Sequence, residues 1–171
     1  LDDVPLYYIN HLGGFISVFD VKAIKKVTLY KSDFPARYGG RLSAILDVRL
    51  KDGNAQKHEH DVSIGTLATR IFSEGPLVKN KITYMVSYRR SNTDLFMKPI
   101  TAAKSGGNKI TSYGFYDLNT KITWKLADKD KVSALLYTGR DKLFFLEKYT
   151  ESGQNQGHSN DRYVIRWGNL V

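Results

Sequence analysis

The chain has 171 residues, 42% hydrophobic and 25% charged, so it can form a folded domain and is not a disordered tail. It contains no cysteine, which excludes disulfides, thiolate-bound zinc and cysteine catalysis, and its net charge of +9 favours a nucleic-acid or phosphate-bearing lipid partner. No run of about 18 apolar residues is present, which excludes a transmembrane helix but not the alternating strands of a transmembrane β-barrel.

Residues 1–53 have a compact, mixed pattern that ends in turn-forming residues at 51–54. Asp20 has the position of an N-cap before a short amphipathic run. The elements expected in this region are, in chain order, an extended segment over 4–9, a turn over 10–14, a short helix over 21–26, a strand over 27–31, a Gly-rich joint over 34–41 and a strand over 44–50.

Beyond a polar linker at residues 54–60, the pattern becomes all β. Five runs near the length of a barrel strand are predicted at 61–74, 81–91, 113–127, 131–142 and 161–171. In the third run, the apolar side chains Tyr116, Leu118, Ile122 and Trp124 alternate with the polar side chains Asp117, Asn119, Lys121 and Thr123. The first and fourth runs alternate poorly, because Leu67, Ile71, Leu135 and Tyr137 interrupt the two-face pattern.

The connections between these runs are alternately short and long. Residues 75–80 and 128–130 are short links, whereas 92–112 and 143–160 are long, polar and Gly-containing. This alternation is typical of outer-membrane barrels, which have tight turns on one side and long loops on the other. Aromatic side chains near the strand ends then indicate membrane interfaces, and the candidates are Tyr113, Phe115, Tyr116, Trp124 and Trp167.

Two stretches of the first 53 residues resemble the plug domain of TonB-dependent outer-membrane receptors. Their residues are most similar to those of receptors from Bacteroidota. The first stretch runs through Val4-Pro5-Leu6-Tyr7, Asn10-His11-Leu12-Gly13-Gly14 and Ala23-Ile24-Lys25-Lys26-Val27. The second, over 34–48, contains the most specific part of the resemblance at residues 36–47. Glu74-Gly75-Pro76 stands where that family has a turn after its first barrel strand.

The resemblance implies a mixed fold: residues 1–53 would be the C-terminal part of an α+β plug, and residues 61–171 the first five antiparallel strands of a 22-stranded transmembrane β-barrel. Both ends of the chain read as cut, so we expect a piece of a longer receptor. Asp3 stands where the family often has Gly, and neither the TonB box nor most ligand-binding loops are present. Five strands alone would leave two edges unpaired in lipid.

The function that the resemblance implies is uptake of a scarce ligand, such as a metal chelate, a vitamin or a glycan, across the bacterial outer membrane. Energy would come from the inner-membrane ExbB–ExbD motor through TonB, which grips a segment N-terminal to this one. The implied surroundings are outer-membrane lipid and lipopolysaccharide, with a surface lipoprotein as a further partner. The resemblance implies no enzymatic activity and no cofactor.

Arg37 and Arg41 flank a glycine pair in the Gly-rich joint. In the resembled family, the arginine of this motif packs against barrel glutamates and latches the plug, which implies this role for Arg37 and secondarily for Arg41. A guanidinium buried at such a boundary needs a carboxylate and offers a breakable bidentate pair, whereas the alternative is a solvated loop arginine. Gly39 and Gly40 are expected to form a tight plug turn, since no phosphate-loop motif follows them.

Other candidate sites are weaker. His58 and His60 share a strand face and have metal-ligand spacing, but no third ligand is visible nearby, so an exposed linker is favoured. His11 and His158 stand alone and are expected in polar loops. No Gly-x-Ser-x-Gly nucleophile elbow is present, so no catalytic residue is predicted. Cations in or beside the long links are candidates for lipopolysaccharide phosphates or for a solvated loop: Lys98, Lys104, Lys109, Arg140, Lys142 and Lys148.

The sequence is also compatible with two other functions. A receptor-like barrel without transport could serve as an assembly or partner-binding platform at the cell surface. A basic β-rich nucleic-acid module would use Tyr, Phe and Trp as stacking platforms. The long strands and the membrane-like alternation disfavour the nucleic-acid module, and no ribonucleoprotein-type aromatic motif is present.

Overall fold

The computed structural model describes the chain except residues 7–9, 32–34, 36–37, 39–43, 151–155 and 171. The described elements are, in order, β1 (Asn10–His11), the 3-10 turn η1 (Leu12–Gly14), β2 (Ile16–Ser17), β3 (Ile24–Tyr30), β4 (Ile45–Leu50), β5 (Glu59–Ile64), β6 (Ala68–Val78), β7 (Ile82–Ser91), α1 (Thr93–Lys104), β8 (Lys109–Lys125), β9 (Lys131–Thr150) and β10 (Gln156–Leu170).

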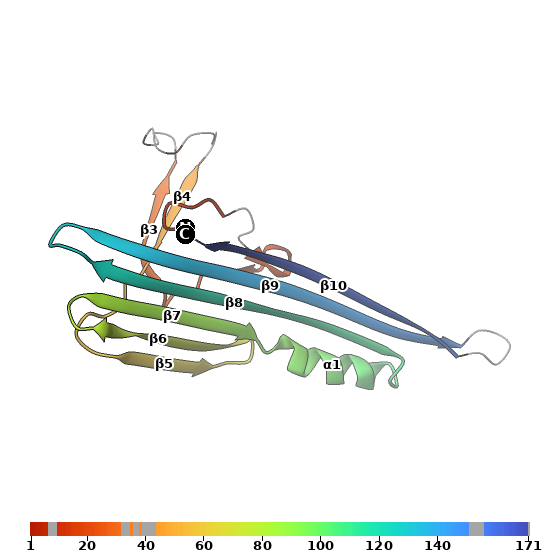
Figure 1. The fold of residues 1–171 in the computed structure, drawn as a ribbon. Helices are drawn as coiled ribbons and strands as arrows, with labels where there is room; N and C mark the ends of the chain where they lie inside the picture. Colours follow the sequence, from red (N-terminus) through yellow and green to blue (C-terminus); the bar gives the residue numbers. More distant parts are fainter. Residues whose placement is uncertain (7–9, 32–34, 36–37, 39–43, 151–155, 171) are drawn as a thin grey trace.

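Six of the strands form one antiparallel sheet in the order β10-β9-β8-β7-β6-β5, so each strand pairs with its neighbours in the chain. Its edge strands, β5 and β10, have no second partner among the described strands. Figure 1 shows β8, β9 and β10 extending well beyond the other three strands, and the β3–β4 hairpin standing out from the sheet. The predicted antiparallel β structure after residue 60 is confirmed.

Described residues of the N-terminal segment (residues 1–53) pack against one face of the sheet, which we call the inner face. A small apolar core joins the two parts: Ala23 and Leu50 of the segment pack with Phe72, Met85 and Leu135 of the sheet. The polar side chains that β8 presents to the same face are also buried, namely Asp117, Asn119, Lys121 and Thr123. Much of the contact between segment and sheet is therefore polar.

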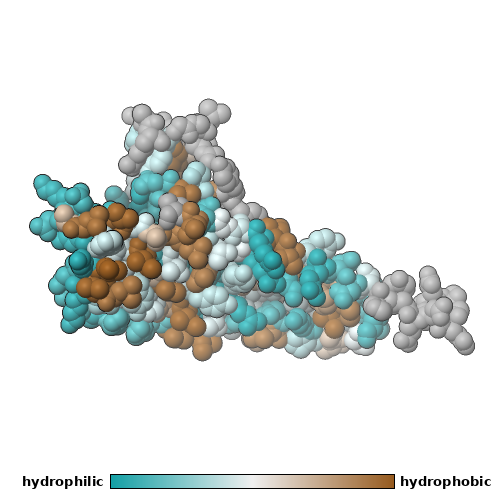
Figure 2. All heavy atoms as spheres, viewed as in Figure 1, coloured by the Kyte–Doolittle hydropathy of each residue, from teal (hydrophilic) through white to brown (hydrophobic). Residues whose placement is uncertain are grey.

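The opposite face of the sheet, the outer face, carries apolar side chains that nothing in the described chain covers. Its exposed members include Val62, Ile64, Ile71, Ile122, Trp124, Val132, Leu136 and Leu170. Figure 2 shows hydrophobic residues gathered over the sheet, with hydrophilic residues at the end that carries the short connections. The usual arrangement of a water-soluble sheet, apolar inside and polar outside, is inverted here.

Three local predictions are wrong. Residues 21–23 form a turn and β3 begins at Ile24, because pairing with β4 overrides the weak helical pattern of 21–26. The predicted strand over 61–74 is two strands, β5 and β6, joined by a turn at residues 65–67, which explains its poor alternation. Glu74-Gly75-Pro76 lies within β6 instead of forming a turn, and the chain reverses at residues 79–81.

The two long links also differ from the prediction. The link after β7 contains α1, the one α-helix among the described residues, in place of a loop. Most of residues 143–160 belongs to β9 and β10, whose register runs without a break from Gln156↔Thr150 to Leu170↔Leu136. The part of the chain that the structure describes has no helix of the length and apolarity needed to span a membrane.

Candidate functional site

Polar side chains on the inner face of the sheet hold the N-terminal segment through three clusters, which we call together the polar seam. The first cluster is centred on His11, at the end of β1. Its Nε2 lies 2.9 Å from both carboxylate oxygens of Asp117 on β8, and its Nδ1 lies 2.5 Å from Oδ1 of Asp141 on β9. The imidazole is fully buried and stacks on Phe115 with ring centroids 4.2 Å apart.

Asp117 is the hub of this cluster. Arg89 donates to its Oδ2 from Nη2 (2.6 Å) and Nε (3.1 Å), and the same Nη2 donates to the carbonyl of Ser17 in the N-terminal segment. A doubly protonated His11 donates from both ring nitrogens, so two cations then face two carboxylates. The cluster is electrically balanced only when His11 carries its proton.

The pKa of His11 follows from these contacts. Burial by itself would lower the pKa, but the hydrogen bonds and charges of Asp117 and Asp141 outweigh burial and raise it above the ordinary value of 6.5. Because the folded-state pKa is raised, this ion cluster contributes fully to stability below pH 6.5, and the contribution is lost as the pH rises through the folded-state pKa.

We therefore expect the N-terminal segment to dock more tightly at mildly acidic pH. The measurement is the rate of protease cleavage within the segment across pH ~5.5 to ~9, in the natural protein and in a His11→Asn variant that cannot take the charge. The natural protein should become more susceptible as the pH rises, relative to the variant. Parallel pH profiles for the two proteins would contradict the assigned role of His11.

The second cluster is centred on Asp20, which is 3% exposed. Its Oδ2 accepts a hydrogen bond from the Ser87 hydroxyl on β7, and Arg70 on β6 reaches its Oδ1 at 3.4 Å. Its Oδ1 also accepts from the backbone N–H of Lys22, which stabilises the turn that replaces the predicted helix. Asp20 is thus a turn former that also ties the segment to the sheet.

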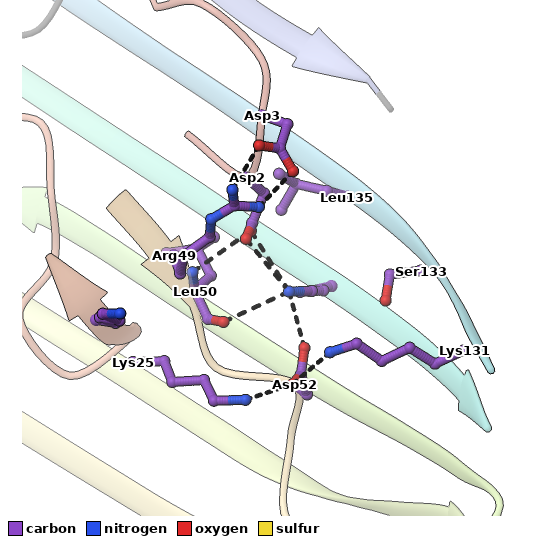
Figure 3. A pocket seen from close by; sticks show the side chains of 11 residues that line it. Asp2, Asp3, Lys25, Arg49, Leu50, Asp52, Lys131, Ser133 and Leu135 are labelled. Atoms are coloured by element: carbon purple, nitrogen blue, oxygen red, sulfur yellow. Dashed lines mark hydrogen bonds and ion pairs between the residues drawn. The ribbon is translucent and has the colours of Figure 1, made fainter. Parts of the chain in front are cut away.

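The third cluster surrounds Asp52, at the end of the N-terminal segment (Figure 3). Lys121 on β8 lies 2.9 Å from Asp52 Oδ1, and Lys25 and Lys131 approach Oδ2 from opposite sides at 2.7 and 3.0 Å. Burial would raise the pKa of Asp52, but the hydrogen bonds from these three ammonium groups hold it well below its usual range. Lys121 also reaches the backbone carbonyl of Leu50 at 3.4 Å.

A pocket of about 410 Å³ lies beside this third cluster, between the segment and the sheet. Most of the charged groups that line it pair with one another: Lys25, Lys121 and Lys131 with Asp52, and Arg49 with Asp3. Such a lining holds two parts of a protein together through directional contacts.

The predicted latch falls outside what the structure describes. Arg37, Arg41, Gly39 and Gly40 all lie among the residues that are left out of the description. Their predicted roles, a plug–barrel latch and a tight turn, stay predictions. The described ties between segment and sheet are instead those of the polar seam.

The five predicted interface aromatics divide between the two faces. Tyr116 and Trp124 lie on the outer face. Tyr113 and Phe115 are buried on the inner face, where Tyr113 Oη accepts a hydrogen bond from Leu12 N–H and Phe115 supports His11. These two side chains face inward because the strand period of two puts odd-numbered residues of β8 under the N-terminal segment; their role at a membrane interface stays a prediction.

Trp167 on β10 also faces inward. Its Nε1 donates to the Tyr137 hydroxyl at 2.8 Å, and its ring lies 5.3 Å from that of His11. Gly139 on β9 makes room for the indole, because a Cβ there would lie 2.6 Å from the Trp167 ring. Trp167 thus packs on the inner face, and its predicted role at a membrane interface stays a prediction.

The histidines differ from their predicted roles in different ways. His58 and His60 lie side by side on the β5 edge, where His58 contacts the Tyr84 hydroxyl and His60 the Ser73 hydroxyl. Within the described ranges, no group of three His, Cys, Asp or Glu side chains could hold a metal ion. His11 is buried, contrary to its predicted place in a polar loop, and the side chain of His158 is not described.

Neither protein-family models, nor curated proteins, nor solved structures give a match to this chain. The features that bear on function are the polarity of the two faces of the sheet and the polar seam.

Proposed function

We propose that this chain is part of a TonB-dependent-type receptor in the bacterial outer membrane. In this proposal, β5–β10 belong to the wall of a transmembrane barrel and residues 1–53 to the plug inside it. The observation that carries the proposal is the inverted polarity of the sheet: a polar inner face buried by the N-terminal segment, and an apolar outer face that the described chain leaves open.

The dimensions of the apolar outer face agree with a bilayer. On β7 it runs from Ile82 to Tyr88 and ends at Arg90; on β9 it runs from Val132 to Thr138 and ends at Arg140. Each run, counted to its arginine, is close to the 9–11 residues that a tilted strand needs to cross the hydrocarbon layer. The unpaired edges β5 and β10 agree with further strands closing the wall, because an open sheet edge is not tolerated in lipid.

The polar seam fits the requirement that a plug be held firmly and still be displaced. An apolar boundary of the same area would bind through contacts that are individually weak and collectively hard to break. Buried ion pairs add little net stability compared with apolar packing. Each charged group nevertheless needs its partner, because an unpaired buried charge is strongly destabilising. A small displacement of the plug would therefore break several ion pairs at once. Uptake of a scarce ligand, driven through TonB from the inner membrane, is the function proposed for such a displaceable plug.

The proposal is tested in the natural protein that contains this segment, with single cysteines introduced into a cysteine-free background. Ile122→Cys lies on the outer face, and Phe145→Cys lies on the extended β9–β10 hairpin with its side chain on the opposite side of the sheet; the two native side chains are similarly exposed, at 43% and 39%. In isolated outer membranes, a membrane-impermeant maleimide should label Phe145→Cys, while nitroxide-bearing lipid should quench a bimane probe only at Ile122→Cys. Equal labelling at both sites, or recovery of the protein in the soluble fraction, would overturn the proposal.

A further inference from the structure

The outer face of β8, β9 and β10 changes character at the level of Tyr116. On the side of the short connections it is largely apolar, and beyond this level cations stand among apolar side chains such as Phe144 and Val164. Arg140 on β9 lies opposite Tyr116 on one side and opposite Arg166 of β10 on the other. Lys142 and Arg162 follow on the same face, further from the apolar region. We call Arg140, Lys142, Arg162 and Arg166 the cationic patch.

The cationic patch has no counter-charge within the described chain. The described side chains that β8, β9 and β10 present to the outer face include no Asp or Glu. No described carboxylate forms an ion pair with any of the four cations, whereas most lysines and arginines that contact the N-terminal segment are paired. The positive charge here is thus available to an external anion.

Arg140 and Arg166 are direct cross-strand neighbours on this face. Like charges in that position destabilise a sheet, because the two side chains are held about 5 Å apart at their Cβ atoms. An anion bound between the two guanidinium groups turns this repulsion into two attractive contacts. Guanidinium groups bind phosphate in a bidentate manner, which makes phosphate the anion best matched to the pair.

The position of the cationic patch on the sheet indicates the source of that phosphate. Arg140 ends the apolar run that begins at Val132, so the patch lies where lipid headgroups meet the hydrocarbon layer. Tyr116 lies beneath Arg140, whose guanidinium carbon is 6.0 Å from the ring centroid, and Tyr88 pairs with Tyr116 at 6.3 Å. Tyrosines at such a border are typical of a membrane interface.

We propose that the cationic patch binds the phosphate groups of an outer-leaflet glycolipid, which in the outer membrane is lipopolysaccharide. The inference rests on the proposed function, because it requires the outer face to lie in the membrane. It also selects among the cations of the sequence: Arg140 and Lys142 belong to the site together with Arg162 and Arg166, whereas Lys109 pairs with Glu147.

The test uses the natural protein purified from outer membranes and an Arg140→Gln/Arg166→Gln variant. The readouts are the amount of co-purified lipopolysaccharide and the affinity for added lipopolysaccharide in nanodiscs. The variant should bind at least about tenfold more weakly, since each lost charge-assisted hydrogen bond accounts for roughly that factor or more. The matched control, Lys79→Gln/Lys129→Gln, removes two exposed charges near the short connections and should bind like the natural protein.

Two further probes identify the ligand. Lipopolysaccharide stripped of its phosphates by phosphatase should bind the natural protein as weakly as intact lipopolysaccharide binds the variant. Inorganic phosphate should compete poorly; displacement of the lipid by inorganic phosphate at comparable concentration would reassign the patch to free phosphate and overturn the proposal. Unchanged binding by the variant, in a protein that does fractionate with the outer membrane, would also overturn it and leave the proposed function intact.

Discussion

Replacing Asp117 by alanine is expected to lower the free energy of unfolding by about 3–5 kcal/mol, the cost of removing one partner from a buried ion cluster. Asp117 is fully buried and is the hydrogen-bond acceptor for His11 and Arg89. Without its carboxylate, both cations stay in a buried site with one counter-charge, Asp141. The measurement is urea-induced unfolding of the natural protein refolded in lipid vesicles, followed by its gel mobility.

Asn119→Ala provides the matched control for this prediction. Asn119 lies on the same strand and face, two positions further, and is 3% exposed, but no hydrogen bond of its side chain is found among the described residues. Its replacement should cost about 1 kcal/mol or less. A double-mutant cycle of Asp117→Ala with His11→Ala then measures the coupling across the polar seam. Equal losses for Asp117→Ala and Asn119→Ala would show that the ion cluster contributes nothing beyond burial.

Leu136→Arg is expected to destabilise the protein in lipid by about 2–4 kcal/mol, the cost of an arginine at the bilayer midplane on the lipid face of a barrel. Leu136 lies on the outer face halfway along the apolar run of β9, with Thr120 and Leu170 as its cross-strand neighbours. It is 39% exposed in the structure, so a water-soluble sheet would accept the long, flexible cation at little cost. The same vesicle unfolding measurement gives the free-energy change.

Phe145→Arg is the control for Leu136→Arg, because Phe145 has the same exposure of 39% but lies on the part of β9 beyond the cationic patch, on the opposite face of the strand. There the proposal places the strand in water, so the change should stay within about 0.5 kcal/mol. We therefore predict a larger loss of unfolding free energy for Leu136→Arg than for Phe145→Arg. Similar tolerance of arginine at both sites would mean that the outer face does not lie in lipid.

The sequence predicted the two faces of β8 correctly. Tyr116, Leu118, Ile122 and Trp124 alternate with Asp117, Asn119, Lys121 and Thr123, and the structure separates these two sets. A period of two is a local property that survives in any sheet, so it can be recognised without the fold. The predictions for 61–74 and 143–160 failed where alternation is lost. This happens at the turn of residues 65–67 and along the β9–β10 hairpin, where residues 143–146 are all apolar and residues 156–162 are polar or Gly.

The polar seam could not be predicted, because its members are far apart in the chain. His11 is 106 residues from Asp117 and 130 from Asp141, and nothing in its local surroundings distinguishes it from a solvated loop histidine. Because burying an isolated charge is costly, buried charged side chains must pair with opposite charges. This rule does not identify which residues form the pairs.

By itself, the amino-acid sequence determined the antiparallel strand pattern, the composition of each strand face and the excess of positive charge, because these depend on residue type and spacing alone. Only the tertiary structure decided that the polar face of the sheet is the buried one, that His11 and Asp52 tie the N-terminal segment to it, and that Arg140 and Arg166 meet at the edge of the apolar face. The physical reason is that burial and pairing depend on which segments lie together, and register between distant strands is set by the whole sheet.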